Sequence, residues 1–436
     1  MSDRNEFLKP ALLALDIDDE GRACKDIPES ACKEQGGNAL RHVASLGLSK
    51  SADGLIDPKL VLSWLLTSLG SPGWLIGLLV PIREAGALLP QLFTAGWLRA
   101  RPQRKWVWAV GAGLQGLSAL AIALSAILLD GLAAGLAILT ALSVLAVARS
   151  LSSVSYKDVL GKTVDKERRG RVTGLAGSLS AGFVIVYALL LSFGLIERMP
   201  LVIGGLCLAG GFWLLGAFIF TGLKEESGAT EGGRNAISAA IENFSYLKTD
   251  PQLRRFILTR GLLTATALAP PFMISAASTS EDSVFGQLGF LILASAGASL
   301  ISSYVWGWLS DRSSRKVLIL SALMGAVALG ATIAFRQAEM LSEVYVLPVV
   351  LFVLMIGYQG VRLGRSTHLV DMADEDTRAA YTALSNTIIG VTLLAGGLFG
   401  VLASLSGVVS VLGLMTLMCL GAAVSGYFLK EVQRAK

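Results

Sequence analysis

Several ionisable residues interrupt segments of the sequence that are otherwise apolar, and these residues are the best suited to do chemistry. They are Lys50, Asp53, Arg83, Glu84, Arg149 and Arg260. A charge near the middle of a bilayer costs about 2.5–3.5 kcal/mol on insertion scales, so such residues face partners or a water-filled space rather than lipid. Carboxylates in that setting can exchange protons, and cations can bind a solute. We therefore predict a polar site built from these side chains.

Arg83 and Glu84 form the strongest pair. They lie near the middle of the apolar run 72–98, close to Pro81 and Gly86, where a helix can bend. Adjacent residues do not face each other on a helix, so the two charges cannot simply neutralise one another. At least one of them should face a cavity or a partner on another helix. The alternative is a buried ion pair that only fixes helix packing.

Lys50 and Asp53 lie in the segment 39–69, which is only weakly apolar. At a rise of 1.5 Å per residue, Asp53 lies roughly 20 Å from the start of this segment, near the midplane of a bilayer. Arg260 lies about 10 Å into the segment 253–277 by the same arithmetic. The alternative is that the first helix begins later and that Lys50 and Asp53 are in water.

Four other charged residues are weaker candidates. Asp57 and Lys59 flank Pro58, which can end or kink a helix at that point. Arg362 and Arg365 stand near the end of a later apolar run, and we expect them at the membrane interface.

The apolar runs themselves predict the elements that must position these charges. Hydrophobic residues make up 53% of the chain and charged residues only 16%, whereas soluble domains are nearer a quarter charged. About 20 apolar residues span a bilayer. We therefore predict an all-α polytopic membrane protein with twelve transmembrane helices, and Pro270-Pro271 should break one of them. The spans are 39–69, 72–98, 105–129, 131–155, 172–195, 200–222, 253–277, 284–309, 316–335, 343–365, 379–404 and 408–429.

Several function classes are disfavoured by the same sequence. The four cysteines are scattered and lack metal-ligand spacing, and no phosphate-binding loop with a following Lys-Ser or Lys-Thr is present. The net charge of +5 comes from basic residues in the links between apolar runs, not from a nucleic-acid patch. We expect no enzyme activity, no metal, no cofactor and no nucleic-acid partner.

The distribution of Lys and Arg predicts orientation. The links 99–105, 157–171, 224–255 and 312–316 are basic, and the opposite links carry few cations. Positive charge favours the cytoplasmic side, so both termini should be cytoplasmic in a plasma (inner) membrane. The predicted units are a tail 1–38, a bundle 39–222, a linker 223–252, a bundle 253–429 and a tail 430–436.

A decapeptide is repeated once along the chain. Gly96–Lys105 and Gly307–Lys316 share Gly, Trp, Leu, Arg, Arg and Lys in place, and Asp311 replaces Ala100. A basic hairpin between two apolar spans, repeated at about half the chain length, predicts two similar six-helix halves.

The second copy resembles the loop signature of the major facilitator superfamily, Gly-x-Leu-x-Asp-Arg-x-x-Arg-Lys. The resemblance implies two six-helix bundles that enclose a central site and open it to either side of the membrane in turn. It also implies a gating role for the hairpins, with Asp311 pairing with Arg312, Arg315 or a helix end. The alternative is a basic anchor that only fixes topology. The predicted gating residues are Gly307, Asp311, Arg312, Arg315 and Lys316, with Arg101 and Arg104 in the first copy.

Arg149 resembles the arginine of another signature of this family, which is associated with proton-coupled carriers. The surrounding serine-rich sequence departs from that signature. The alternative is an arginine that extends its side chain to the interface.

Together these features predict a monomeric secondary transporter that moves a small organic solute by alternating access, coupled to protons through Glu84 and Asp53. One alternative is a facilitative or anion-exchange carrier, suggested by the excess of cations among the intramembrane charges. The other is a non-transporting membrane assembly factor or sensor, with 1–38 and 224–250 as its binding surfaces. The bilayer, the solute and protons are the expected partners.

Overall fold

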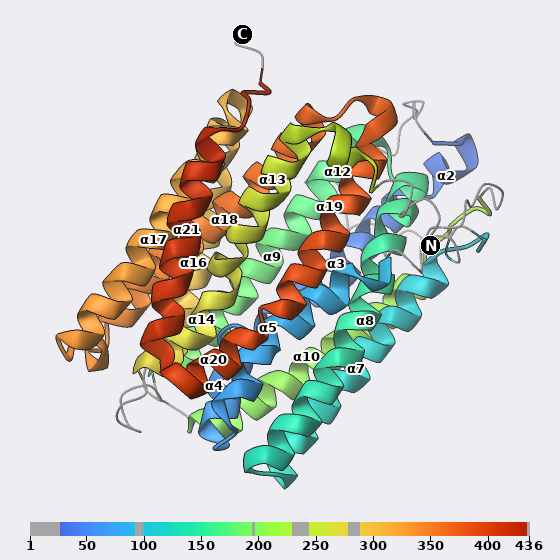
Figure 1. The fold of residues 1–436 in the computed structure, drawn as a ribbon. Coiled ribbons are helices and arrows are strands. Elements are labelled where there is room, and N and C mark those ends of the chain that lie inside the picture. Colours follow the sequence, from blue (N-terminus) through green and yellow to red (C-terminus); the bar gives the residue numbers. More distant parts are fainter. Residues whose placement is uncertain are drawn as a thin grey trace.

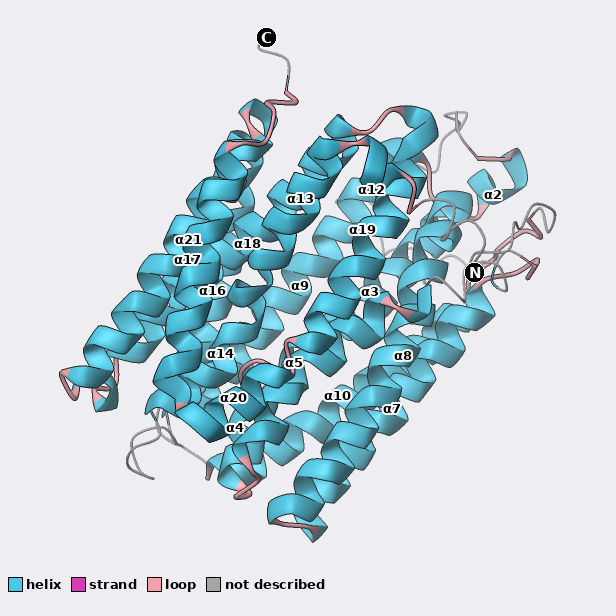
Figure 2. Cartoon of the chain, viewed as in Figure 1, coloured by secondary structure: helices cyan, strands magenta, loops and turns pink. Residues whose placement is uncertain are grey.

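The computed structural model describes residues 27–91, 98, 100–193, 197–228, 244–277 and 288–433, which form helices joined by short loops (Figure 2). The long helices run roughly parallel or antiparallel in two bundles (Figure 1). The first half contains α2 (Glu29–Lys33), α3 (Gln35–Leu55), α4 (Val61–Ser68), α5 (Gly73–Leu88), α7 (Lys105–Leu128), α8 (Gly131–Thr163), α9 (Lys166–Phe193) and α10 (Arg198–Thr221). The second contains α12 (Tyr246–Thr249), α13 (Pro251–Leu262), α14 (Thr264–Ala277), α16 (Leu288–Arg312), α17 (Ser314–Gln337), η1 (Met340–Ser342), α18 (Val346–Met372), α19 (Glu375–Ala395), α20 (Leu398–Ser406) and α21 (Val408–Tyr427).

The fold is that of an all-α membrane protein. Among the described residues, nine helices or joined helix pairs are long and apolar enough to cross a bilayer, and a bent pair within α16 raises this number to ten. The predicted spans 39–69 and 72–98 are not among them. The first corresponds to the charged helix α3 followed by α4, and the second to the 16 residues of α5 before residues 92–97, which lie outside the described part. Residues 1–26 of the predicted tail and 229–243 of the linker also lie outside it.

Several helices are longer than the apolar runs that predicted them. The basic link 157–171 is not a loop, because α8 continues to Thr163 and α9 begins at Lys166. In the second half α18 continues to Met372 and α19 begins at Glu375. Apolar runs report contact with lipid, whereas a helix satisfies its own backbone hydrogen bonds and can continue into water.

The first segment of each half is a broken helix. In the first half α3 ends at Leu55, and Asp57 accepts hydrogen bonds from the backbone N–H groups of Lys59 (2.7 Å) and Leu60 (3.1 Å) across the break. In the second half the break lies at Leu263, between α13 and α14. The prediction that Pro270-Pro271 breaks this span was wrong, because both prolines lie inside α14. The fixed φ of proline is compatible with a helix. The backbone carbonyl groups that lose their N–H donor at a proline can be satisfied by neighbouring helices or side chains.

Small residues allow the helices to approach closely within each half. A Cβ added at Gly116 of α7 would lie 2.9 Å from the carbonyl oxygen of Gly210 on α10. Such approaches are typical of helix packing in lipid, where dispersion replaces the hydrophobic effect as the driving force. The halves meet chiefly where α9 packs on α16 and where α5 packs on α19 and α20.

The molecule has two ends along the direction of its long helices. The tail end is where α3 and α13 begin and α21 ends, and the distal end is where α4 ends and α20 turns into α21 (Figure 1). The halves are in backbone contact near the distal end. A Cβ added at Gly77 of α5 would lie 2.6 Å from Cα of Gly400 on α20, and Gly289 of α16 lies against Ser192 of α9.

Candidate functional site

A cluster of three charged side chains lies inside the first half. Asp53 of α3 binds Arg83 of α5 through one carboxylate oxygen (2.7 Å) and Arg149 of α8 through the other (2.6 Å). Arg149 also donates a hydrogen bond to Ser49 Oγ (3.2 Å), which accepts another from Trp213 Nε1 (3.1 Å). A single carboxylate therefore joins three helices of this half, and the cluster carries one more positive than negative charge.

Glu84 has a different partner from its neighbour Arg83. Its carboxylate lies 3.7 Å from Nζ of Lys59, in the break between α3 and α4. Lys59 is buried and its Nζ stands 3.6 Å from the ring centre of Tyr358, on α18 of the second half. A cation over an aromatic ring is attracted by the ring's negative face. Lys59 is thus held by one group from each half.

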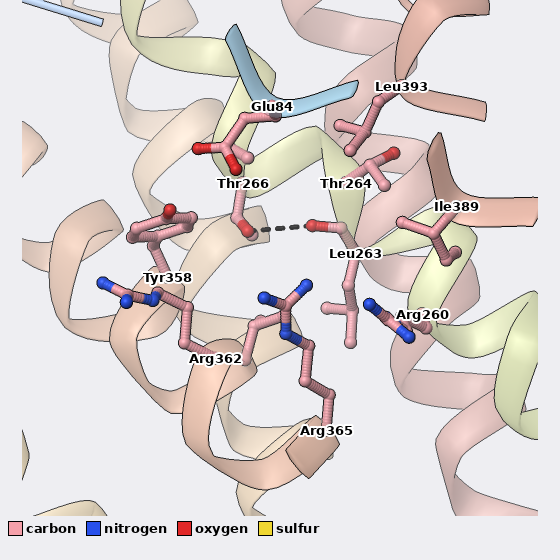
Figure 3. Close-up of a pocket in the computed structure, with 12 residues that line it drawn as sticks. Glu84, Arg260, Leu263, Thr264, Thr266, Tyr358, Arg362, Arg365, Ile389 and Leu393 are labelled. Carbon is pink, nitrogen blue, oxygen red and sulfur yellow. Dashed lines mark hydrogen bonds between the residues drawn. The ribbon is translucent and has the colours of Figure 1, made fainter. Parts of the chain in front are cut away.

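A cavity opens beside this contact, between the two halves. Its lining includes Glu84 from α5 and three arginines from the second half: Arg260 of α13, with Arg362 and Arg365 of α18. Figure 3 shows the three arginines on one side of the cavity and Glu84 on the opposite side. The volume of about 30 Å³ has room for roughly two waters. In this conformation the cavity has charged groups among apolar ones and is too small for an organic solute.

Arg260 is buried, with 6% of its surface exposed. Its guanidinium donates hydrogen bonds to Ser385 Oγ (2.6 Å) and Asn386 Oδ1 (2.8 Å), both on α19. Both partners are neutral, and Arg260 Nε is buried with no hydrogen-bond partner. The charge of Arg260 is therefore solvated by neutral groups alone within the described residues.

The charged residues named from the sequence divide into two groups. Asp53, Arg83 and Arg149 form one cluster, and Glu84 and Arg260 line the cavity. Lys50 belongs to neither group. Its Nζ points toward the backbone carbonyl of Thr173 on α9, at 3.5 Å.

The hairpin of the second half differs from its expected form. Gly307, Asp311 and Arg312 belong to the last turns of α16, and only Ser313 separates this helix from α17. Asp311 is exposed and forms no ion pair within the described residues, so its expected pairing with Arg312 or Arg315 is wrong for this conformation. Arg312 instead stacks on Trp308, at 3.8 Å from the ring centre.

An acid from the C-terminal segment occupies the place expected for Asp311. Glu431 accepts a hydrogen bond from Ser313 Oγ (2.5 Å) and lies 3.6 Å from Arg315 Nε. Lys316 is exposed, and its backbone N–H donates to Ser313 Oγ, which caps α17. A negative charge at the N-terminus of a helix is stabilised by the helix dipole.

The first hairpin has an equivalent acid. Glu225, which follows α10, accepts hydrogen bonds from the backbone N–H groups of Arg104 (3.1 Å) and Lys105 (2.7 Å) at the start of α7, and from Lys162 Nζ (3.0 Å). Arg104 also pairs with Asp158 of α8. Arg101 is exposed at the tail end, while Gly96 and Arg99 of this copy lie outside the described residues. Glu225 and Glu431 therefore hold equivalent positions, each after the last helix of its half.

The comparison with known proteins agrees with this architecture. A profile described as Major Facilitator Superfamily matches residues 264–436. The structure is similar to a crystal structure of a mutant of the nucleoside transporter NupG, with a TM-score of 0.70 and 12% identity over 90% of this chain and 100% of that chain. It is also similar to a D-xylose-proton symporter, with a TM-score of 0.65 and 11% identity over 91% of this chain and 99% of that one. Residues 264–436 therefore match the Major Facilitator Superfamily profile, and the chain shares the fold of these two transporters. Both of these solved structures are of transporters.

A curated relative matches over a shorter segment. The "Staphyloferrin B transporter" of Staphylococcus aureus (strain NCTC 8325 / PS 47) is 37% identical over 73 residues, which are 17% of this chain and 18% of that protein. The match therefore spans less than a fifth of that relative's length.

Sequence reasoning missed some residues at the cavity. Arg362 and Arg365 were expected at the membrane interface but line the cavity, and Tyr358 lies beside them. The spacing of these three, four and then three residues apart, places them on one face of a helix and could have revealed them. Lys59 was discounted because of Pro58, yet the break is what brings its side chain to Glu84.

Proposed function

We propose that this protein is a secondary active transporter that moves a small organic solute by alternating access, coupled to protons. The observation that carries the proposal is the contact of Lys59 with Glu84 in the first half and with Tyr358 in the second, at the edge of a cavity between them. A residue that contacts both halves can couple the protonation of its carboxylate partner to the relative position of the two halves.

Protonation of Glu84 would remove the negative charge that holds Lys59 on the first half. Lys59 would then keep only Tyr358 and the nearby carboxylate of Asp57 as partners among the described residues, and the charge of the cavity would become more positive. The charged groups near Glu84 are Lys59 and Asp57 in the helix break, Arg83 beside it on α5, and Arg362 and Arg365 across the cavity. A change in charge among them shifts the population of the two access states by as much as it stabilises one over the other.

Asp53 is the second carboxylate of the proposed coupling. Its protonation would leave Arg83 and Arg149 without the anion that they share. Two guanidinium groups freed in this way repel one another, which favours a state in which the helices that carry them move apart.

We infer that the conformation described here faces the cytoplasm, with both termini on that side of a plasma (inner) membrane. The close approach of Gly77 to Gly400 supports this, because it seals the distal end, away from both tails. The basic residues at the tail end, among them Arg101 and Arg312, favour a cytoplasmic position. The transporter would act as a monomer, since each bundle is complete within one chain.

A two-step experiment tests the proposal. A thermal-shift screen of the purified protein against metabolites at two pH values identifies ligands, because binding to the folded state raises its apparent stability. Uptake of each ligand is then measured in proteoliposomes with and without a pH gradient. Wild-type uptake should respond to the gradient, and Glu84→Gln and Asp53→Asn should lose that response. The control Glu226→Gln, which removes an exposed carboxylate, should retain it.

Three results would contradict the proposal. If Glu84→Gln and Asp53→Asn both keep full dependence on the pH gradient, the assignment of the coupling residues is wrong. If uptake is driven by an outward anion gradient without any pH gradient, the protein is an exchanger. Co-purification of one protein partner, with no solute bound or transported, would indicate an assembly factor.

A further inference from the structure

The three cavity arginines, of which Arg260 is buried, Arg365 half-buried and Arg362 exposed, have no anionic partner among the described residues. In the first half, Arg83 and Arg149 share Asp53. In the second half, none of Arg260, Arg362 and Arg365 forms an ion pair within the residues that the structure describes. Glu84, the one acid in the cavity lining, is already paired with Lys59. The cavity therefore has an excess of positive charge in the described conformation.

The burial of Arg260 makes this excess costly. A guanidinium stays protonated in proteins, so burial cannot neutralise it. A buried charge without a counter-ion is strongly unfavourable, because neutral hydrogen-bond partners replace only part of its hydration. Ser385 and Asn386 each accept one hydrogen bond, and Nε remains without an acceptor. Such a site is completed by an anionic ligand that brings both charge and acceptors.

The arrangement of the arginines suits a ligand with more than one anionic group. Arg362 and Arg365 lie on one face of α18, and Arg260 comes from α13, so the guanidinium groups reach the cavity from two helices (Figure 3). Each planar fork can bind a carboxylate or phosphate through two hydrogen bonds. Tyr358 adds an aromatic ring to the same wall.

We propose that the transported solute is an organic anion with two or more carboxylate or phosphate groups, bound by Arg260, Arg362 and Arg365. This inference rests on the proposed transport function and specifies its substrate class. The cavity of about 30 Å³ must widen to admit such a solute, so the bound state has the two halves further apart than the described one.

The test measures binding to the full-length protein in phosphatidylcholine nanodiscs by thermal unfolding. The probes are citrate, succinate and inorganic phosphate, with neutral succinamide as the matched uncharged compound and sodium chloride at equal ionic strength. Citrate or succinate should raise the apparent Tm, and succinamide and chloride should not. Equal stabilisation by succinamide and succinate, or no stabilisation by any anion, would overturn the proposal. Stabilisation by inorganic phosphate alone, which carries a single anionic group, would refute a solute with two or more such groups.

Variants assign the binding to the cavity. Arg260→Gln should weaken anion binding by about 10- to 100-fold, since it removes charge-assisted hydrogen bonds. The same variant should raise the Tm of the ligand-free protein, because it removes an uncompensated buried charge; a merely structural arginine would give the opposite change. Arg365→Gln supplies a second, less buried test. The control Arg254→Gln, on the exposed face of α13, should bind like the wild type. Unchanged binding in Arg260→Gln and Arg365→Gln would refute the assignment.

Two further measurements distinguish a solute site from a lipid site, and the anion site from the transport function. Nanodiscs with phosphatidylglycerol test whether a lipid headgroup fills the site: stabilisation by this lipid that depends on Arg260, without binding of any soluble anion, would refute a solute site.

Proteoliposome uptake tests transport separately from binding. Proton-driven uptake of a neutral solute would leave the transport function standing and overturn the anion site. Arg260-dependent anion binding without any uptake would support the anion site and overturn the transport function.

Discussion

The glutamate that follows the last helix of each half caps a hairpin, and the two caps differ in burial. The side chain of Glu225 is 0% exposed, and that of Glu431 is 34% exposed. Glu225 accepts two backbone N–H groups and the Lys162 ammonium, whereas Glu431 accepts Ser313 Oγ and lies 3.6 Å from Arg315 Nε. The substitutions Glu225→Gln and Glu431→Gln therefore compare the same change at two equivalent positions.

The expected loss of stability differs because of that burial. In the Glu225→Gln variant the side-chain amide would keep one acceptor oxygen but would place an NH₂ donor against groups that are themselves donors. Breaking a buried ion pair costs about 3–5 kcal/mol, and we reduce this to about 2–3 kcal/mol because Lys162 is 24% exposed and can regain water. The pair of Glu431 with Arg315 is partly exposed and should contribute at most about 1 kcal/mol.

Thermal unfolding in detergent at one scan rate measures the difference. A loss of 1 kcal/mol lowers Tm by roughly 2–4 °C for a cooperative unit of 150–250 residues. Glu225→Gln should therefore lower the apparent Tm by roughly 4–12 °C and Glu431→Gln by less than half as much. Glu226→Gln, at the exposed neighbouring position, should leave Tm nearly unchanged. A shift for Glu225→Gln no larger than that for Glu431→Gln would refute the argument from burial.

Two further changes test the contacts at the ends of the bundles. Gly77→Ala should open the distal contact, because its Cβ would meet Gly400; overpacking costs about 1–3 kcal/mol, so amides of α20 should exchange hydrogen roughly 5- to 100-fold faster. Gly73→Ala, in open space on the same helix, is the control, and equal exchange in the two variants would refute the seal. Asp311→Asn should change stability by less than about 0.5 kcal/mol, since Asp311 is exposed and unpaired within the described residues. It should nevertheless slow proteoliposome uptake more than Ala100→Ser, and equal rates would remove the gating role of Asp311.

Much of the fold was predictable from the sequence. Length and apolarity of the runs predicted the membrane helices, because a bilayer demands about 20 apolar residues for each crossing. The repeated decapeptide predicted two similar halves, and its second copy resembles the loop signature of the family whose profile matches residues 264–436. These features are local or repetitive, so they can be seen without knowing which segments are in contact.

The positions of helix ends were less predictable. The extension of α8 to Thr163 and of α9 from Lys166 passes through a basic stretch that hydropathy assigns to a link. The Pro270-Pro271 pair predicts a helix break, but both prolines lie inside α14. In the first case the helix continues into water because it satisfies its own backbone hydrogen bonds, and in the second neighbouring groups satisfy the backbone around the prolines.

The sequence by itself determined which charges interrupt the apolar runs, and the tertiary structure decided which of them are buried and which meet. Asp53 lies 30 positions from Arg83 and further still from Arg149, and only the packing of α3, α5 and α8 makes it the shared partner of both. The Glu84 side chain points away from that of Arg83 because adjacent residues of a helix do not face each other. It lies near Lys59 because the first segment breaks between α3 and α4, where Lys59 stands. Arg260 is left without a carboxylate by the same packing, because α19 presents only Ser385 and Asn386 to it. Pairing between distant residues depends on how helices assemble, and no local property of the sequence records it.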